Sequence, residues 1–407
     1  MRISTSQLYD RGLNSIMTGQ SGMSDLQQQL SNGKKLQTAE DDPVGATQVI
    51  RLTEELDQIT QYNRNNTMLQ SRLEEQEAVL TSMTSALTRA RTLMIQSGNG
   101  IYAVEDRQAL ASEIGLIRDQ AFDLMNARNA SGEYIFAGYQ TESAAFDYNA
   151  SATGNKYTFV GDQGTNNTAI SPTVTLQSSS SGQTVFENVF AAREASISST
   201  VGATSASVSI TQDAAFERFH SDNYDAVTTA NNEYQWTILA GNQIQLTNVG
   251  TGATVDTVSF SSGSAFTYKG MEFTIEGAAG DTVNFTLDPP EKKNVAETLN
   301  DFYLALTNTD LVGVDFGESL DKALIGIDNG MRAVETEMAS IGGRGNVAQS
   351  VYEGNLDMEI VHKTARSNIE DVDYAEAVSE LSKQETALQA AQTTFGMVTK
   401  MSLFDYI

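Results

Sequence analysis

Apolar residues recur at seven-residue intervals through a long stretch near the front of the chain, with one polar interruption at Asn66. The members of this repeat are Leu52, Ile59, Leu73, Leu80, Leu87 and Met94. A heptad pattern of this length predicts a helix of about 45 residues, or ~65 Å, that packs on other helices in the manner of a coiled coil.

Two further apolar stripes have the spacings of three and four residues that one face of a helix requires. They comprise Leu110, Ile114, Ile117, Ala121 and Leu124, and then Leu324, Ile327, Met331, Val334, Met338, Ile341 and Ala348. Together with the first repeat, these stripes predict the core of a helical bundle.

The apolar period changes to alternation between residues 150 and 290, for example at 234–238 and 271–275. Alternation of this kind is typical of half-buried β-strands. Residues 271–275 and 283–287 flank a glycine-rich segment, which predicts that they pair as a hairpin.

Prolines and serine-rich stretches set the limits of this β region. Pro289 and Pro290 end it, because a helix cannot run through them. The serine- and threonine-rich stretches 178–182 and 196–211 are expected to be exposed loops or edge strands.

The two ends of the chain carry heptad repeats of equal length. The first is Tyr9, Ile16, Met23 and Leu30, and the second is Tyr374, Leu381, Leu388 and Phe395. Equal lengths, about 32 Å each as helix, predict that the two ends pair with each other. Gly12, Gly19 and Gly22 dilute the first repeat, and each costs about 1 kcal/mol relative to alanine in a helix interior. We therefore expect a marginal pair that needs neighbours to fold.

The segment between the N-terminal repeat and the long heptad helix has the residues of a helix joint. Asn32 and Gly33 tolerate the positive φ that ends a helix, and Asp42 followed by Pro43 is typical of an N-cap and a first helical residue. At the other end, Ser367 and Glu370 have capping-box spacing and predict a helix start just before the C-terminal repeat.

These patterns predict a mainly α protein in which N- and C-terminal segments form a long-helix coiled-coil bundle around an inserted, mostly-β domain. The predicted divisions are 1–41 with 367–407 for the terminal helices, 42–149 with 291–366 for the bundle, and 150–290 for the β domain.

Charge and composition narrow the possible partners. The chain has 52 acidic and 25 basic residues, a formal net charge of −27, which disfavours binding to nucleic acid or to an anionic membrane. No run approaches the ~20 apolar residues of a membrane span, and the first residues lack the pattern of a secretory signal. The absence of cysteine excludes disulfides and thiol chemistry.

Candidate catalytic or metal-binding groups all have a simpler structural interpretation. The acids at Glu370, Asp371 and Asp373 suit the first turn of a helix, where its dipole favours negative charge. Residues 342–345 contain three glycines without the features of a phosphate loop and are expected to break the helix locally. His220 and His362 are expected to have surface or packing roles. No cofactor, metal or catalytic residue is predicted.

The joint and the C-terminal segment also carry a family resemblance. NGKKLQTAEDDPVGATQVIRL at 32–52 and IEDVDYAEAVSELSKQETALQAAQTTFGMVTKMSLFDYI at 369–407 resemble the flagellin superfamily. Within it, GEYIFAGYQTESAAF at 132–146 and the final SLFDYI are similar to the hook–filament junction proteins, whereas flagellins usually end in a leucine-rich tail. Between the two ends, only EFTIEGAAGDTVNFTLDP at 272–289 matches.

The resemblance implies a structural, non-enzymatic protein of the bacterial flagellum, located outside the cell and exported unfolded without a cleaved signal peptide. In that family the paired termini line an inner tube, the bundle forms an outer tube and the insert points outward. The implied partners are hook-associated protein 1, flagellin, further copies of the chain in a ring, an export chaperone and the export apparatus. Two alternatives remain: a flagellin that forms the filament itself, and an enzyme or carbohydrate-binding module on the β insert.

Overall fold

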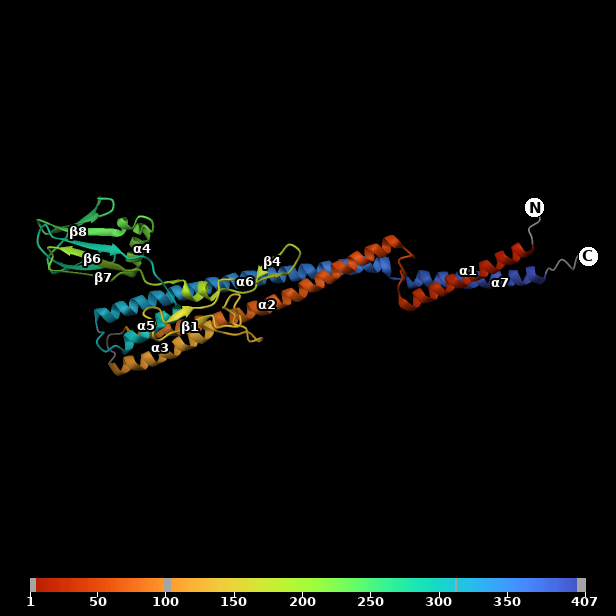
Figure 1. The fold of residues 1–407 in the computed structure, drawn as a ribbon, viewed down its shortest axis with the longest axis horizontal. Coiled ribbons are helices and arrows are strands. Elements are labelled where there is room, and N and C mark those ends of the chain that lie inside the picture. Colours follow the sequence, from red (N-terminus) through yellow and green to blue (C-terminus); the bar gives the residue numbers. More distant parts are fainter. Residues whose placement is uncertain (1–4, 99–103, 312, 401–407) are drawn as a thin grey trace, which may run out of the picture. The chain divides into compact units, whose positions relative to one another are not determined.

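The computed structural model describes residues 5–98, 104–311 and 313–400. The chain divides into two compact units. The first combines the chain up to Met68 with Ala169–Thr175 and the chain from Val347 onward, and the second combines Leu69–Thr168 with Leu176–Asn346. Two long helices, α2 (Pro43–Ser97) and α6 (Val314–Glu370), contribute residues to both units (Figure 1).

The first unit brings the two ends of the chain together. Helix α1 (Thr5–Asn32) runs alongside α7 (Tyr374–Lys400), which confirms the predicted pairing of the ends (Figure 1). In the same unit α2 packs on α6, and the polar member of its heptad, Asn66, is fully buried there. Its side-chain amide donates a hydrogen bond of 2.8 Å to the carbonyl oxygen of Ala348, so this buried polar group has a hydrogen-bond partner.

A short segment from the middle of the sequence also belongs to the first unit. Ala169–Thr175 overlaps the ends of the short strands β3 (Asn167–Ala169) and β4 (Thr175–Gln177). Asn65 of α2 donates a hydrogen bond to the carbonyl of Ala169, and Asn355 of α6 donates one to that of the buried Ile170. Two asparagines therefore hold this segment on the helices.

The second unit contains the helical bundle, in which α2 and α6 join α3 (Val104–Met125) and α5 (Val295–Thr307). The buried members of the predicted stripes in this unit are Leu73, Leu80, Leu87, Met94, Ile114, Ile117, Ala121, Ile327, Val334 and Ile341. The bundle core was therefore predicted correctly, but α5, with its buried Leu299, Phe302 and Leu306, was not.

The predicted break at residues 342–345 is wrong, because α6 continues through them without interruption. Ile341 is buried in the bundle just before the glycines. The Arg344 guanidinium pairs with the Glu337 carboxylate at 2.5 Å and donates to the carbonyl of Gln177 at 3.1 Å. These contacts offset the roughly 1 kcal/mol that each glycine costs in a helix.

The segment between α3 and the β sandwich packs on the bundle. It includes β1 (Phe146–Tyr148), β2 (Tyr157–Phe159), a π-helical turn (Gln183–Glu187) and β5 (Val189–Phe190), which pairs with β14 (Lys292–Lys293). Its buried aromatic residues are Phe136, Phe146, Tyr157 and Phe186. The expectation of an exposed loop or edge strand at 178–182 is wrong: Ser178 and Ser180 are buried and bonded to the Gln76 side chain.

The β sandwich consists of two antiparallel sheets and helix α4 (Asp213–Asn223). One sheet has the order β10-β9-β8-β13-β6, and the other has the order β11-β12-β7. The strand bounds are β6 Ala195–Val201, β7 Ser205–Ile210, β8 Glu233–Leu239, β9 Gln243–Asn248, β10 Thr254–Ser259, β11 Ala265–Tyr268, β12 Met271–Glu276 and β13 Thr282–Leu287. The fully buried Trp236 contacts Phe266, Tyr268 and Phe273 edge-on, with centroids 5.3–5.6 Å apart.

The strands of the sandwich correct one prediction and bear out another. β12 and β13 belong to different sheets, so the predicted hairpin is wrong, and the link between them crosses the sandwich. Phe273 of β12 and Phe285 of β13 face each other across the core, with ring centroids 5.0 Å apart. The two strands therefore pack face to face across the sandwich and do not pair edge to edge. The stretch 196–211 supplies β6 and β7, which are edge strands as expected.

Candidate assembly site

Glycines on α1 receive large side chains from α7. A Cβ placed on Gly12 would come within 2.6 Å of the Phe395 ring, and one placed on Gly19 would lie 3.5 Å from a methyl carbon of Leu388. Gly33, just after α1, has a φ of +72°, and a Cβ placed on it would lie 3.1 Å from the Tyr374 hydroxyl. The glycines therefore act as sockets, and their missing side chains let the two helices approach closely.

The sockets define an antiparallel register. From Gly12 to Gly19 and on to Gly33, the steps are seven and fourteen residues. The opposing residues, Phe395, Leu388 and Tyr374, are separated by the same steps in the reverse direction. The predicted C-terminal repeat thus faces the glycines, while Tyr9 of the N-terminal repeat packs its ring on Phe395.

Pairing leaves much apolar surface uncovered. Of the helical residues with described burial in α1 and α7, Ala377 alone is buried. Ile16, Met23, Leu30, Leu381, Leu388 and Phe395 are half-buried. Large apolar side chains that remain exposed are Tyr9, Leu13, Met17, Tyr374, Val378 and Met397. Apart from Ala377, the described residues of the pair form no fully buried core, and their exposed apolar side chains are suited to contact with another molecule.

The breaks in the two chain ends lie side by side and bond to each other. The amide of Lys35 donates to the carbonyl of Glu370 at 2.7 Å, and the amide of Val372 donates to that of Gly33 at 3.0 Å. The Lys34 ammonium forms an ion pair with the Glu370 carboxylate. Two segments more than 300 residues apart in sequence therefore form one structural joint.

Aspartates organise the N-terminal side of this joint. Asp42 caps α2, because its Oδ1 accepts hydrogen bonds of 3.0 Å from the amides of Val44 and Gly45, while Pro43 is the first residue of the helix. Asp41 accepts from the amides of Thr38 and Gln37, and these donors lower the pKa of its carboxyl.

The predicted capping box at Ser367 and Glu370 is wrong. Both residues lie in the last turn of α6, and the Ser367 hydroxyl donates to Asp371 instead of capping a helix. The N-cap of α7 is Asp373, whose Oδ1 accepts from the amides of Ala375 and Glu376 at 2.9 and 3.2 Å. The acids near residue 370 thus include a true cap, one residue before α7 begins.

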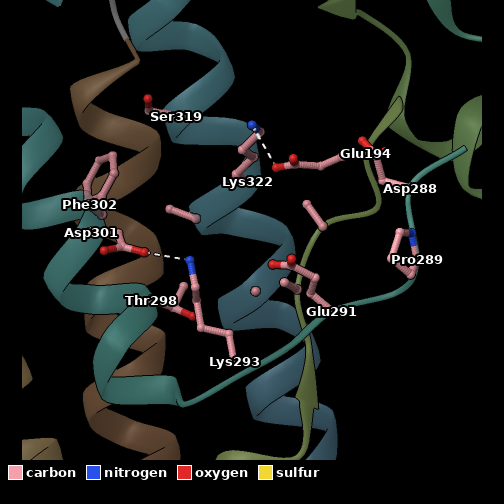
Figure 2. A pocket seen from close by; sticks show the side chains of 14 residues that line it. Glu194, Asp288, Pro289, Glu291, Lys293, Thr298, Asp301, Phe302, Ser319 and Lys322 are labelled. Carbon is pink, nitrogen blue, oxygen red and sulfur yellow. Dashed lines mark hydrogen bonds and ion pairs between the residues drawn. The ribbon is translucent and has the colours of Figure 1, made fainter. Parts of the chain in front are cut away.

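A charged cavity of about 330 Å³ lies at the root of the β sandwich (Figure 2). Lys322 pairs with Glu194 at 2.7 Å, and Lys293 pairs with Asp301 at 2.6 Å, so both ammonium groups in its wall are neutralised. The two histidines lie elsewhere. His220 is buried, stacks on Tyr224 and bonds to the carbonyl of Asp288, whereas His362 contacts Glu55 on the surface of the helices.

Neither a metal-ligand cluster nor a membrane-spanning helix is present in the described residues. No set of three or more histidine and carboxylate side chains among them is placed to hold a metal ion. No helix in that part of the chain is both long and apolar enough to cross a membrane.

The family models for the bacterial flagellin N-terminal and C-terminal helical regions match residues 3–141 and 324–407. Together they cover more than half of the 407 residues and include both members of the terminal pair. The chain therefore belongs to the bacterial flagellin family, and its central β region lies outside the matched parts.

Within that family, the chain is similar to flagellar hook-associated protein 3. It is 37% identical to the Salmonella typhimurium protein over 147 residues and 34% identical to the Escherichia coli protein over 146 residues. These matches cover 36% of this chain and 46% of each relative, so the chain spans about half the length of the curated relatives it matches. Flagellin from Listeria monocytogenes is 30% identical over 132 residues, 32% of this chain and 46% of that flagellin.

Solved structures share the fold. Flagellar hook-associated protein-3 from Legionella pneumophila superposes with a TM-score of 0.60 at 21% identity and covers 79% of this chain and 98% of its own. FlgL from Xanthomonas campestris gives a TM-score of 0.56 at 22% identity, covering 78% of this chain and 99% of its own. About a fifth of this chain therefore has no counterpart in these structures.

Proposed function

We propose that this protein is a structural component of the bacterial flagellum that joins the hook to the flagellin filament. The observation that carries the proposal is the glycine-socketed pair of α1 and α7, which holds both chain ends together and leaves apolar side chains exposed. Such a surface is suited to repeated packing against like copies. The similarity to hook-associated protein 3 favours a junction over the filament itself.

The proposed neighbours are hook-associated protein 1 on one side, flagellin on the other and copies of the chain in a ring. The site residues for these contacts are the terminal repeats, Tyr9, Ile16, Met23, Leu30, Tyr374, Leu381, Leu388 and Phe395. Before assembly, an export chaperone covers the C-terminal stripe, and the export apparatus passes the chain out of the cell unfolded, without a cleaved signal. The role is mechanical and needs no cofactor.

The test is reconstitution on hooks. Hooks capped with hook-associated protein 1 are incubated with the purified chain and then with flagellin, and filament growth is scored by electron microscopy. We expect growth only when the chain is added. Long filaments formed by the pure chain would instead favour a flagellin, and absence of growth with the folded chain would refute the junction role.

A matched pair of variants links this assay to the site. Gly12→Leu fills the socket of Phe395, whereas Gly343→Leu introduces the same side chain on α6, where an added Cβ meets no atom within 4 Å. We expect the first variant to lose junction activity and the second to keep it. Equal junction activities of the two variants would show that junction assembly does not depend on the Gly12 socket.

A further inference from the structure

Two segments connect the β sandwich to the bundle, and helix α4 contacts both of them. They are residues 191–194, between β5 and β6, and residues 288–291, between β13 and β14, and we call them the linkers. The amide of Asp288 donates a hydrogen bond of 3.0 Å to the carbonyl of Glu194, so the linkers lie side by side (Figure 2). Anything that holds or releases the linkers therefore acts at the attachment of the sandwich.

Each linker has its own partner on α4. The Arg193 guanidinium donates to the carbonyl of Glu217 at 3.0 Å and pairs with the carboxylate of the same residue at 3.2 Å. On the second linker, the carbonyl oxygen of Asp288 lies 2.7 Å from Nε2 of His220. Because a carbonyl oxygen can only accept, Nε2 carries the proton and donates it. We call these two contacts of α4 the latch.

The imidazole of His220 has no room for a second proton. The side chain is fully buried, edge-on to the Phe216 ring at 5.7 Å and stacked on the Tyr224 ring at 5.1 Å between centroids. With the proton on Nε2, Nδ1 is a bare acceptor, and it has no hydrogen-bond partner within the described residues. A proton added to Nδ1 would leave a buried charge whose N–H group has no acceptor, which is costly.

The charged groups around His220 come from α4 and from both linkers. Burial is the largest influence and lowers the pKa of the imidazole, whereas its hydrogen bond with the Asp288 carbonyl raises it. Arg193 on the first linker lowers the pKa, and the carboxylates of Glu217 and Asp288 raise it. The net effect is a pKa below the ordinary value of 6.5, so the closed latch favours the neutral ring.

This preference makes closure of the latch depend on pH. When α4 opens, His220 reaches water and recovers its ordinary pKa of 6.5, so below that pH the open form binds more protons than the closed one. The latch therefore has its full stability above pH 6.5 and loses it as the pH falls toward the lower pKa of the closed form. One pH unit of acidification in this window favours opening by at most about tenfold.

We propose that α4 is an acid-sensitive latch that grips both linkers at neutral pH and releases them when His220 is protonated. Release converts the linkers from a fixed attachment of the sandwich into a flexible one. The inference goes beyond the junction role and does not depend on it, because it concerns the attachment of one part of the chain to another.

Hydrogen exchange of the purified full chain tests the latch. Exchange of peptides from α4 is followed by mass spectrometry at pH 7.5 and pH 5.5, and protection is corrected for the pH dependence of the chemical exchange rate. We expect protection of the α4 amides to be up to about tenfold lower at pH 5.5, one unit below the ordinary value of 6.5. Equal protection at the two pH values would overturn the proposal.

A pair of histidine variants assigns the effect. His220→Gln keeps an N–H donor for the Asp288 carbonyl and cannot take up a proton, so its protection should not fall at pH 5.5. His362→Gln, on the surface of the helices, should behave like the unsubstituted chain. Burial raises the pKa of Asp213 and Asp321, which therefore favour the folded form in acid, and comparison between variants cancels their contribution. Loss of protection in His220→Gln equal to that of the unsubstituted chain would overturn the role of His220.

Nuclear magnetic resonance provides a second measurement that leaves His220 in place and so does not depend on how the His220→Gln variant folds. The chain has two histidines, so a ¹⁵N-histidine-labelled His362→Gln variant reports on His220 alone. We expect the tautomer with the proton on Nε2 and a titration midpoint below pH 6.5. A midpoint at or above 6.5, or a proton on Nδ1 at neutral pH, would overturn the latch.

Discussion

The ring of Tyr9 packs against the ring of Phe395, with centroids 5.0 Å apart and planes tilted by 51°. The two residues are separated by almost the entire sequence, and one turn further along α1 the same Phe395 occupies the socket of Gly12. Both chain ends must therefore be present before either helix buries its apolar face.

Filling a socket should separate the terminal helices. Gly12→Leu places a branched side chain where Phe395 lies. We therefore expect overpacking to destabilise the pair of α1 and α7 by about 1–3 kcal/mol. Gly343→Ala, in open space on α6, should instead stabilise its helix by up to about 1 kcal/mol. Thermal unfolding followed by circular dichroism measures both effects, and stabilisation by Gly12→Leu would contradict the socket.

The terminal pair should be the part of the free monomer that proteases remove first. Its helices bury little apolar surface, whereas the bundle buries whole stripes. Mild proteolysis is expected to stop near Gly33 and, since α6 continues to Glu370, between residues 371 and 373. Mass spectrometry of the resistant core identifies the ends. Protection of α1 and α7 equal to that of residues 69–97 would show that the ends are folded before assembly.

The C-terminal stripe should bind the export chaperone while the ends are unpaired. Leu388→Ser combined with Phe395→Ser removes the two large side chains that otherwise fill the glycine sockets. We expect weaker chaperone binding by calorimetry and an unchanged melting temperature of the bundle, which contains neither residue. Unaltered affinity of the double variant would show that the chaperone does not bind through these two side chains.

Removal of the β sandwich should leave the junction intact. Residues 150–290 were the predicted insert, but Lys156 and Ser180 bond to Glu297 of α5 and Glu337 of α6, and the π-helical turn that contains Phe186 contacts α5. We therefore compare two deletions with a glycine–serine linker, one of 150–290 and one of 193–289. The shorter deletion should fold and keep filaments attached, and the longer one should lower the bundle's melting temperature. Loss of junction assembly by a folded, exported shorter variant would give the sandwich an essential role.

Acidic residues near the root of the sandwich make stability depend on pH. Burial, followed by the charge of Glu318, raises the pKa of Asp321, and burial together with Asp321 and Glu217 raises that of Asp213. A raised folded-state pKa means that the folded form favours the proton, so stability is highest below the unfolded value near 3.8 and falls as pH rises through the folded value.

Asp321→Asn should therefore raise the melting temperature at pH 7 and have no such benefit at pH 3.5. Asp57→Asn, which removes an exposed acid from α2, controls for the change in net charge. The measurement is the melting temperature of each variant between pH 3.5 and pH 7. Equal increases in melting temperature for both variants at pH 7 would assign the effect to net charge alone.

Heptad spacing was sufficient to predict the bundle and the pairing of the ends, because buried apolar positions repeat with the helix itself. The register was missed, since Gly12 and Gly19 were judged by helix propensity alone and Gly33 only as a residue that ends a helix. Their spacing in multiples of seven, opposite a heptad of large residues, was the available signal.

The wrong predictions have a common physical origin in patterns that fit two structures. Alternation in β12 and β13 is the same whether the strands pair edge to edge or face each other across a sandwich. Ser367 and Glu370 have capping-box spacing, but spacing does not reveal that α6 has not yet ended. Arg344 pairs with Glu337 two turns earlier on α6 and donates to the carbonyl of Gln177, a contact distant in sequence that local composition cannot predict.

The antiparallel register makes the lengths of the two terminal segments interdependent. One residue inserted between Gly12 and Gly33 would rotate part of α1 by about 100°, and the sockets beyond it would turn away from α7. A matching insertion in α7 would be needed at the same level to restore the fit. Natural relatives should consequently vary in length between the paired segments and keep the number of residues within them fixed. Only then do the spacing of the sockets on α1 and the spacing of the large side chains on α7 stay equal.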